Sequence, residues 1–145
     1  MIDLYNNPHI EIIKEKYPDY FTGFVTSKGY KINSNQDRIR TLIDWEAMDK
    51  KYAIPYFMEN SDKKIKNGLI NSVFGQQNTI VLIEFGPNEP MVKTTNKYFI
   101  EHWDDFISDY GSLGASLISL DGNFLLEFTD DTYYLLYSNF PIPIQ

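Results

Sequence analysis

The sequence predicts an α+β fold: an antiparallel β-meander of about four strands, within residues 79–138, with three to four helices packed mainly on one face. Two patterns predict it. The first half of the chain repeats apolar residues at helical spacing, and the second half combines a β-branched run with a hairpin signal. At 145 residues, 43% of them hydrophobic, the chain is long enough to bury a core, and we expect one domain over residues 1–145.

The first half is predicted to begin with a short helix and an extended segment. The helix is expected after Asn7-Pro8 and before Pro18, because this Asn-Pro pair suits a helix start and the later proline stops it. Its apolar side consists of Ile10, Ile13 and Tyr17. Residues 21–32 mix β-forming residues with two glycines and are predicted to be a strand or an extended loop.

Two longer helices are predicted next. Ser34-Asn35 suits the start of the first, and Pro55 ends it. Its buried stripe is Ile39, Leu42, Ile43, Ala47 and Tyr52. The second begins at Ser61-Asp62 and ends at Gly75, where we expect a left-handed residue. Its stripe is Ile65, Leu69, Ile70, Val73 and Phe74.

The second half is predicted to begin with a largely buried strand, TIVLIEF, at residues 79–85, followed by a turn at residues 86–90. Thr95 or Asn96 is expected to cap a fourth helix, which Gly111 ends. One side of this helix is aromatic and apolar, with Tyr98, Phe99, Trp103, Phe106, Ile107 and Tyr110. Acidic residues occupy the rest of its surface.

Two hairpins are predicted after that helix. Asp121-Gly122 lies between two apolar runs and favours a tight turn, because both residues tolerate a positive φ. A two-residue loop there sets Leu117 opposite Leu126. Asp130-Asp131 is a weaker turn pair, and a two-residue loop there sets Leu126 opposite Leu135. Asp121, Asp130 and Asp131 are thus explained first as turn residues, and only Glu127 lies inside a strand.

These registers predict one apolar sheet face and one mixed face. The apolar face holds Ala115, Leu117, Phe124, Leu126, Phe128, Tyr133, Leu135 and Tyr137. The mixed face holds Ile118, Asn123, Leu125, Glu127, Thr129, Tyr134 and Leu136. We expect the first face to carry the helices, and the second to be either half covered by another helix or left open for binding.

Composition excludes several classes of function. The chain has no cysteine, which rules out disulfides, a thiol nucleophile and thiolate zinc sites. The N-terminal stretch has no basic region and no unbroken apolar run, and no later span is long enough for a membrane helix. We therefore expect a cytoplasmic protein that makes no contact with a membrane.

Charge is unevenly distributed along the chain. Residues 1–72 hold 11 Lys and Arg against 10 Asp and Glu, whereas residues 73–145 hold two lysines against ten acids. The second half therefore repels phosphate, which argues against nucleic acid as a direct ligand, and it attracts cationic surfaces. An acidic surface also serves solubility, which is its commonest explanation.

The sequence offers little support for catalysis. His9 and His102 are the two histidines; each suits a surface or capping position, and no G-x-S-x-G elbow, P-loop or dinucleotide motif is present. Asp105 and Asp109 are one helical turn apart near Asp104, but two such carboxylates usually form a solvated helix face and not a metal site. We expect no enzyme activity, no metal and no cofactor.

A protein-binding surface is the better hypothesis. Carboxylates on the fourth helix and at the second turn lie near aromatic rings that can anchor a basic protein. The candidate partner-binding residues are Glu101, Asp104, Asp105, Asp109, Asp130, Asp131 and Tyr134.

The last third of the chain also resembles a known group of proteins. The order YFIEHWDDFISDYGSLGASLISLDGNFLLEFTDDTYYLLYSNFPI, with its W-D-D-F helix and S-x-D-G hairpin, resembles small immunity proteins of bacterial polymorphic-toxin and contact-dependent growth inhibition systems. The resemblance implies a small acidic cytoplasmic protein without catalysis that binds and neutralises one cognate basic toxin domain, often a nuclease. We expect the chain itself to be a monomer or weak dimer. It assigns no individual functional residue.

Two other functions remain open at this point. One is a small enzyme that uses His102 with Asp104 or Asp105 as a general acid and base. The other is an adaptor that pairs with a partner strand through a sheet edge or through the mixed sheet face.

Overall fold

The computed structural model describes residues 1–13, 20–33, 41–86, 88–130 and 134–144. The strands are β1 (Glu11–Ile13), β2 (Tyr52–Pro55), β3 (Ile80–Glu84), β4 (Met91–Thr95), β5 (Ala115–Ser119), β6 (Leu125–Phe128) and β7 (Leu135–Ser138). The helices are α1 (Tyr20–Ser27), α2 (Ser61–Asn71), α3 (Asn96–Glu101) and α4 (Trp103–Tyr110), with a single 3-10 turn, η1 (Trp45–Ala47).

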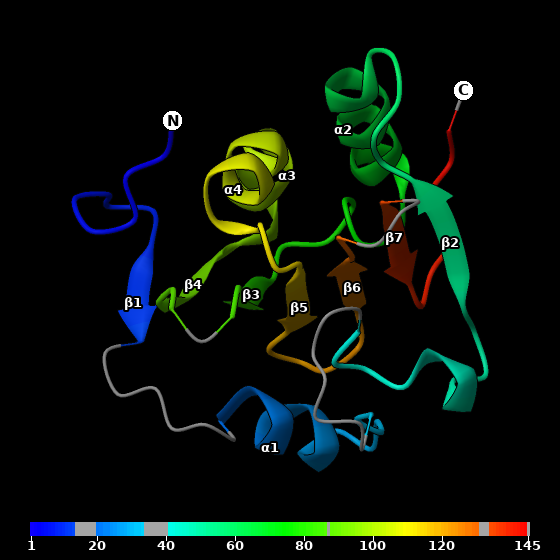
Figure 1. The fold of residues 1–145 in the computed structure, drawn as a ribbon. Helices are drawn as coiled ribbons and strands as arrows, with labels where there is room; N and C mark the ends of the chain where they lie inside the picture. Colours follow the sequence, from blue (N-terminus) through cyan, green and yellow to red (C-terminus); the bar gives the residue numbers. More distant parts are fainter. Residues whose placement is uncertain (14–19, 34–40, 87, 131–133, 145) are drawn as a thin grey trace.

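All seven strands belong to one antiparallel sheet, in the order β1-β4-β3-β5-β6-β7-β2 (Figure 1). The expected α+β class is confirmed. The expected number of about four strands is wrong, because β1, β2 and β4 extend the sheet beyond the predicted strands. The central strands β3, β5 and β6 are buried almost throughout, so they form the middle of a two-sided core.

Helices lie on both faces of this sheet (Figure 1). The segments α2, α3 and α4 cover one face over a large apolar cluster, and α1 and η1 cover the other over a smaller one. Consecutive residues of β5 point to opposite faces, since Leu117 belongs to the first cluster and Ile118 to the second. Of the two alternatives for the mixed face, cover by a helix is the one observed.

The expected first helix is wrong over the described residues, because Glu11–Ile13 is the edge strand β1, paired with β4. Asn7 does not cap a helix. Its side-chain oxygen accepts a hydrogen bond from His9 N at 2.9 Å, which is an Asx turn that competes with helix formation. Ile12 then packs on the large cluster and Ile13 on the small one, so the run alternates as a strand does.

The expected strand at residues 21–32 is also wrong, because α1 occupies most of it. Phe21 and Val25, four residues apart, are both buried against the sheet, which is the spacing of a helix face. The helix ends at Ser27, Gly29 follows with a φ of +93° that suits glycine, and Tyr30 N donates back to Val25 O at 3.4 Å. Tertiary packing has overridden the β preference of the individual residues.

Of the helix expected between Ser34 and Pro55, residues 34–40 lie outside the described ranges. Over the described residues 41–55 this helix is not formed. Ile43 instead makes an isolated bridge with Ile32, η1 forms a single turn, and the segment ends in β2. A hydrogen-bonding side chain from the sheet, Glu127, takes the backbone N–H groups of Leu42 and Ile43, which diverts this stretch from a helix.

The predicted helix after Ser61 and the predicted strand at residues 79–85 are confirmed as α2 and β3. Gly75, however, is not left-handed. A Cβ on Gly75 would lie 2.0 Å from Leu69 O, so glycine is needed there for close backbone packing.

The helix predicted between Thr95 and Gly111 is present but divided. Thr95 Oγ1 accepts a hydrogen bond from Tyr98 N at 3.0 Å, which confirms the predicted cap. His102, with φ −118°, ends α3 and begins α4, so the two short helices change direction there. Gly111 follows the second, as expected.

The first hairpin register is confirmed and the second is wrong. Leu117 lies opposite Leu126, as the Asp121-Gly122 loop requires. Leu126, however, lies opposite Ser138 and not Leu135, so the observed pairing is shifted by three residues from the predicted one. An odd shift exchanges the faces of β7. Tyr137 therefore packs in the small cluster, and Leu136 takes its place in the large one.

Candidate functional site

The structure brings three of the predicted acids together beside a fourth. Glu101, Asp104 and Asp105 line an open hollow of about 190 Å³ at the junction of α2, α3 and α4. The other lining residues are Asp62, Lys66, His102 and Trp103. We call this group the acidic hollow. Its four carboxylates against one lysine give it a net negative charge.

Local helix structure positions these carboxylates. Asp62 is in the first turn of α2, and Asp104 and Asp105 are in the first turn of α4, where an acid interacts favourably with unpaired backbone N–H groups. Trp103 joins the two helix starts, because its indole N–H donates to Asp62 O at 3.0 Å. The hollow is therefore held from the core and not by its own charges.

The electrostatics of the hollow concentrate on Asp104. Partial burial raises the pKa of Asp104, and the nearby carboxylates of Asp62 and Asp105 raise it further. Lys66 lies 3.6 Å from Glu101 and offsets part of the charge at that side. Within the described ranges no lysine or arginine makes an ion pair with Asp104, so this carboxylate keeps a negative potential that a bound cation would relieve.

Asp105 and Asp109 also serve the N-terminal segment. The amino group of Met1 lies 4.0 Å from Asp105, and Ile2 N donates to Asp109 Oδ2 at 3.1 Å. Tyr110 completes the attachment by donating its hydroxyl to Ile2 O at 2.6 Å. Asp109 is not part of the acidic hollow, and its observed role is to fasten residues 1–4 onto α4.

The remaining predicted residues lie at the end of the β6–β7 hairpin. Asp131 is outside the described residues. Thr129 N donates to Leu135 O at 3.0 Å, and Leu135 N donates to Thr129 Oγ1 at 3.1 Å. Asp130 and Tyr134, each next to one of these residues, therefore lie at the same hairpin end. The ring of Tyr134 lies 6.0 Å from Tyr56, and Tyr56 lies 6.3 Å from Trp103. One aromatic row therefore joins this hairpin end to the acidic hollow.

Sequence reasoning missed two residues of this surface. Asp62 was assigned only to a helix start, and Phe57 received no role. Asp62 comes close to Asp104 only through helix packing, which no local pattern reveals. No local signal singles out Phe57, since a single exposed aromatic is ordinary and its contact with Tyr134 is tertiary.

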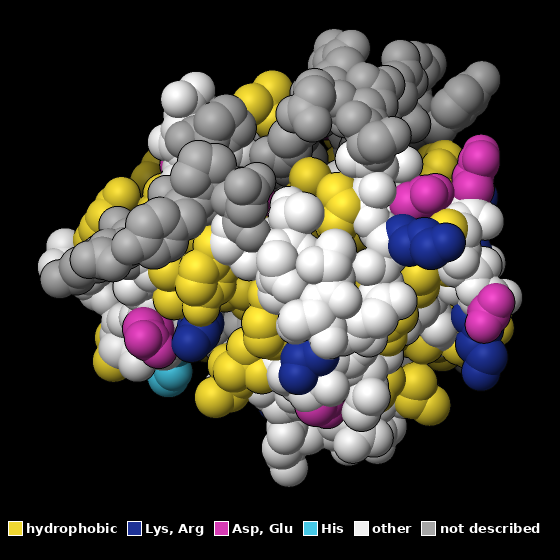
Figure 2. Space-filling view, turned by 90° about the horizontal axis from the view of Figure 1, so that it is seen from below, with side chains coloured by type: hydrophobic (Ala, Val, Ile, Leu, Met, Phe, Trp, Pro, Cys, Tyr) yellow, Lys and Arg dark blue, Asp and Glu magenta, His cyan; other side chains and the backbone are white. Residues whose placement is uncertain are grey.

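The opposite face of the sheet has a different charge pattern. In the coloured part of Figure 2, which views the α1 side, acidic and basic side chains lie next to one another along the margins, with apolar side chains between them. In this coloured part the two signs of charge are mixed, whereas the lining of the acidic hollow has four carboxylates against one lysine.

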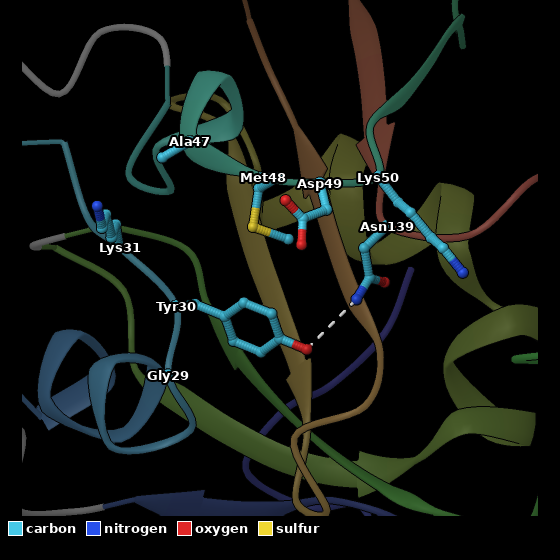
Figure 3. A pocket seen from close by; sticks show the side chains of 8 residues that line it. All are labelled: Gly29, Tyr30, Lys31, Ala47, Met48, Asp49, Lys50 and Asn139. Atoms are coloured by element: carbon cyan, nitrogen blue, oxygen red, sulfur yellow. Dashed lines mark hydrogen bonds between the residues drawn. The ribbon is translucent and has the colours of Figure 1, made fainter.

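A larger hollow of about 320 Å³ lies on that side, and Figure 3 shows its lining. Tyr30 and Asn139 point toward one another, with 3.5 Å between the Asn139 amide nitrogen and the Tyr30 hydroxyl. Both are used internally, since Tyr30 OH donates to Gly122 O at 2.8 Å and Asn139 Nδ2 donates to Asn123 O at 3.0 Å. This hollow is a structural junction between the β5–β6 loop and its neighbours.

The two histidines flank the ring of Tyr98. The His9 ring is stacked 4.6 Å from it, and the His102 ring is tilted 4.4 Å from it. His102 shares the acidic hollow with Asp104 and Asp105, but in the described part of the chain no hydrogen bond joins its ring to a carboxylate. The arrangement of a base held by an orienting acid is thus not formed there. Among the described residues no group of three His, Asp or Glu has the arrangement of a metal site.

Glu127 is the most buried carboxylate and is used for structure. It accepts hydrogen bonds from Leu42 N at 2.8 Å, Trp45 Nε1 at 2.8 Å and Ser116 Oγ at 2.5 Å. Burial raises its pKa, while these donors act in the opposite direction. Since the side chain is 2% exposed, it is out of reach of a substrate in solution.

The outer edge of β2 is poorly suited to strand addition. Tyr56 N donates to Tyr134 O at 2.9 Å, so by alternation Ile54 also turns its backbone toward β7, and Ala53 and Pro55 turn outward. Proline has no N–H, which leaves Ala53 as the outward donor of this short strand. The adaptor hypothesis therefore gains no support at this edge.

Comparison of the chain with protein-family models, curated proteins and solved structures finds no significant match. In the part of the chain that the structure describes, no helix combines the length and the apolar character needed to cross a bilayer.

Proposed function

We propose that this chain is a cytoplasmic immunity protein that binds and neutralises a cognate basic toxin domain in a stoichiometric complex. The observation that carries the proposal is the acidic hollow, in which carboxylates from three helices gather beside an aromatic row. The resemblance of residues 98–142 to immunity proteins points to the same class of partner.

The physical basis is competition for a phosphate-binding surface. A toxin that cleaves RNA or DNA must hold phosphate groups and therefore exposes Lys and Arg. Carboxylates placed on that surface compete with the nucleic acid, and the opposite charges speed encounter in a salt-sensitive way. Asp104 is the centre of this attraction, since its charge is opposed by neighbouring carboxylates and a cation would stabilise its ionised form.

The proposal is tested by titrating the toxin domain encoded next to this gene with the purified chain, following both binding heat and toxin activity. We expect one-to-one binding tighter than micromolar at moderate salt, with weaker binding as salt rises. Binding no tighter than micromolar at moderate salt, or toxin activity that persists in excess chain, would contradict the proposal.

Two double variants with the same change in net charge locate the site. Asp62→Asn with Asp104→Asn removes two carboxylates from the acidic hollow, and we expect affinity to fall about tenfold or more. Glu46→Gln with Asp49→Asn removes two exposed carboxylates from the η1 side, and we expect little change. Equal losses in both double variants would mean that net charge alone, and not this site, governs binding.

A further inference from the structure

An exposed aromatic pair stands beside the acidic hollow. Phe57, in the loop between β2 and α2, is 77% exposed, and Tyr134, just before β7, is 41% exposed. Their ring centroids lie 5.2 Å apart. Single exposed apolar residues are ordinary on protein surfaces, but two rings brought together from segments distant in sequence form a surface patch.

The pair rests on a rigid base. Tyr56, which is buried, places its ring edge against Tyr134 and against Phe128, and donates its hydroxyl to Thr129 O at 2.6 Å. Its backbone N–H donates to Tyr134 O at 2.9 Å. The rings are therefore presented from the core, so a partner that binds them has little disorder to remove.

The backbone at this patch is strained. Tyr134 has a φ of +48°, a left-handed conformation that is unfavourable for a residue other than glycine. Asparagine or glycine would satisfy such a turn more easily. Such positions persist where the surrounding structure holds them, as Tyr56 holds Tyr134 here, and they cluster at functional sites. The identity of Tyr134 is thus better explained by its ring than by its turn.

Carboxylates border the patch. Asp130 follows Thr129, whose backbone N–H donates to Leu135 O next to Tyr134, and Glu59 is exposed two residues after Phe57. Asp62 is linked to the patch through Trp103, whose indole N–H donates to Asp62 O and whose ring contacts Tyr56. Aromatic faces next to carboxylates favour guanidinium over ammonium, because arginine stacks on a ring while its N–H groups bond an acid, whereas lysine is more strongly hydrated.

We propose that Phe57 and Tyr134 form the apolar anchor of the interface and receive an arginine side chain of the basic partner. The bordering carboxylates then form ion pairs with the guanidinium group of that arginine. This inference rests on the proposed function and specifies the chemistry of its partner. Phe57 then carries a large share of the binding free energy, as a central aromatic of an interface commonly does.

The test compares an oligo-arginine and an oligo-lysine peptide of equal length as probes, by calorimetric titration at low salt. Wild type should bind oligo-arginine more tightly. Phe57→Ala should weaken oligo-arginine binding about tenfold and abolish the preference. Tyr134→Asn should do the same without lowering the melting temperature, because asparagine accepts the left-handed backbone. The control is Tyr5→Ala, which removes a ring that is 69% exposed in the N-terminal segment and should change neither affinity.

An arginine preference that survives Phe57→Ala, or that Tyr5→Ala abolishes equally, would overturn the assignment. The toxin-domain titration separates the two proposals. If wild type and Phe57→Ala neutralise the toxin domain equally, the anchor is wrong and the proposed function stands. If wild type binds neither the peptides nor the toxin domain, the proposed function fails with it.

Discussion

The two faces of the sheet are stabilised by different chemistry. On the face under α2, α3 and α4, the Trp103 ring stacks 5.8 Å from Phe128, and further rings continue the cluster. On the face under α1 and η1, a smaller apolar cluster surrounds the buried carboxylate of Glu127. The first face is held by apolar packing over a large area, and the second depends on one buried hydrogen-bonding side chain, Glu127, that ties residues 42–45 to β6.

This difference bears on where the proposed binding residues lie. The rings that stabilise the first face continue outward to Tyr134 and Phe57, so the exposed patch is an extension of the core. The second face ends in side chains whose polar groups bond to the chain itself, such as Tyr30 and Asn139. Variants on each side should therefore affect stability and binding in different proportions.

The largest effect is expected for Trp103→Ala. This change removes the stacking on Phe128, the T-shaped contact with Tyr56 and the hydrogen bond to Asp62 O, and we expect a loss of about 3–5 kcal/mol in the free energy of unfolding. Urea unfolding followed by circular dichroism measures it. Phe24→Ala, on a half-buried ring of the opposite face, should cost clearly less. A comparable loss in both would show that the two faces do not differ as described.

The second largest effect is expected for Glu127→Gln, with a loss of about 2–4 kcal/mol in the free energy of unfolding. An amide supplies one oxygen, and its NH₂ group would face the donors of Leu42, Trp45 and Ser116. The same urea experiment applies. A variant as stable as wild type would mean that the carboxylate does not hold this face.

Glu127 also gives the second face a pH dependence of defined sign. Because its pKa is raised in the folded state, the folded protein binds the proton more tightly than the unfolded chain does. The contribution of this proton to the free energy of unfolding is present below the ordinary glutamate pKa, and it is lost as the pH rises through the pKa of Glu127 in the folded protein. Measured from acid toward neutral pH, wild type should lose stability relative to Glu127→Gln, and the opposite trend would contradict the assignment.

Asn96→Ala sharpens the comparison, because this buried amide is a neutral counterpart of Glu127. It donates to Phe74 O and Gln77 O, both at 2.9 Å, and accepts from Thr79 N. We expect a loss of about 1–3 kcal/mol, since three backbone groups lose their partner. Thermal melting at several pH values should give the same loss throughout, whereas a loss that changes with pH would indicate coupling to a titrating group.

The smallest effect is expected for Tyr30→Phe. Removing the hydroxyl leaves the ring in place and deletes the hydrogen bond to Gly122 O, with a loss of about 1 kcal/mol. The melting temperature should fall slightly and affinity for the toxin domain should not change. A marked loss of affinity would mean that the hollow in Figure 3 takes part in binding.

Parts of the fold were predictable because their signals are local. The Asp121-Gly122 turn fixed one register, and Thr95 marked a helix start. The helix α1 was not predictable from its residues, which favour strands; it forms because a helix covers the small cluster. The second register failed because Tyr134 adopts a left-handed backbone for which Tyr carries no signal.

The candidate site was predictable to a similar degree. The acids of α3 and α4 were found from charge along the chain, whereas Asp62 joins them only through the packing of α2 against Trp103. The attachment of Ile2 to Asp109 likewise depends on a tertiary contact. Charge patterns identify acidic segments, but they do not separate acids that face a partner from acids that fasten the chain.

The most direct test of the account is amide NMR of the isotope-labelled chain during titration with the toxin domain. We predict that chemical-shift changes concentrate at the first turns of α2 and α4 and at residues 56–60 and 134. The α1 and η1 side should remain unchanged. Changes centred on α1 and η1, or spread evenly over both faces, would contradict the claim that the acidic hollow and its aromatic pair recognise the partner.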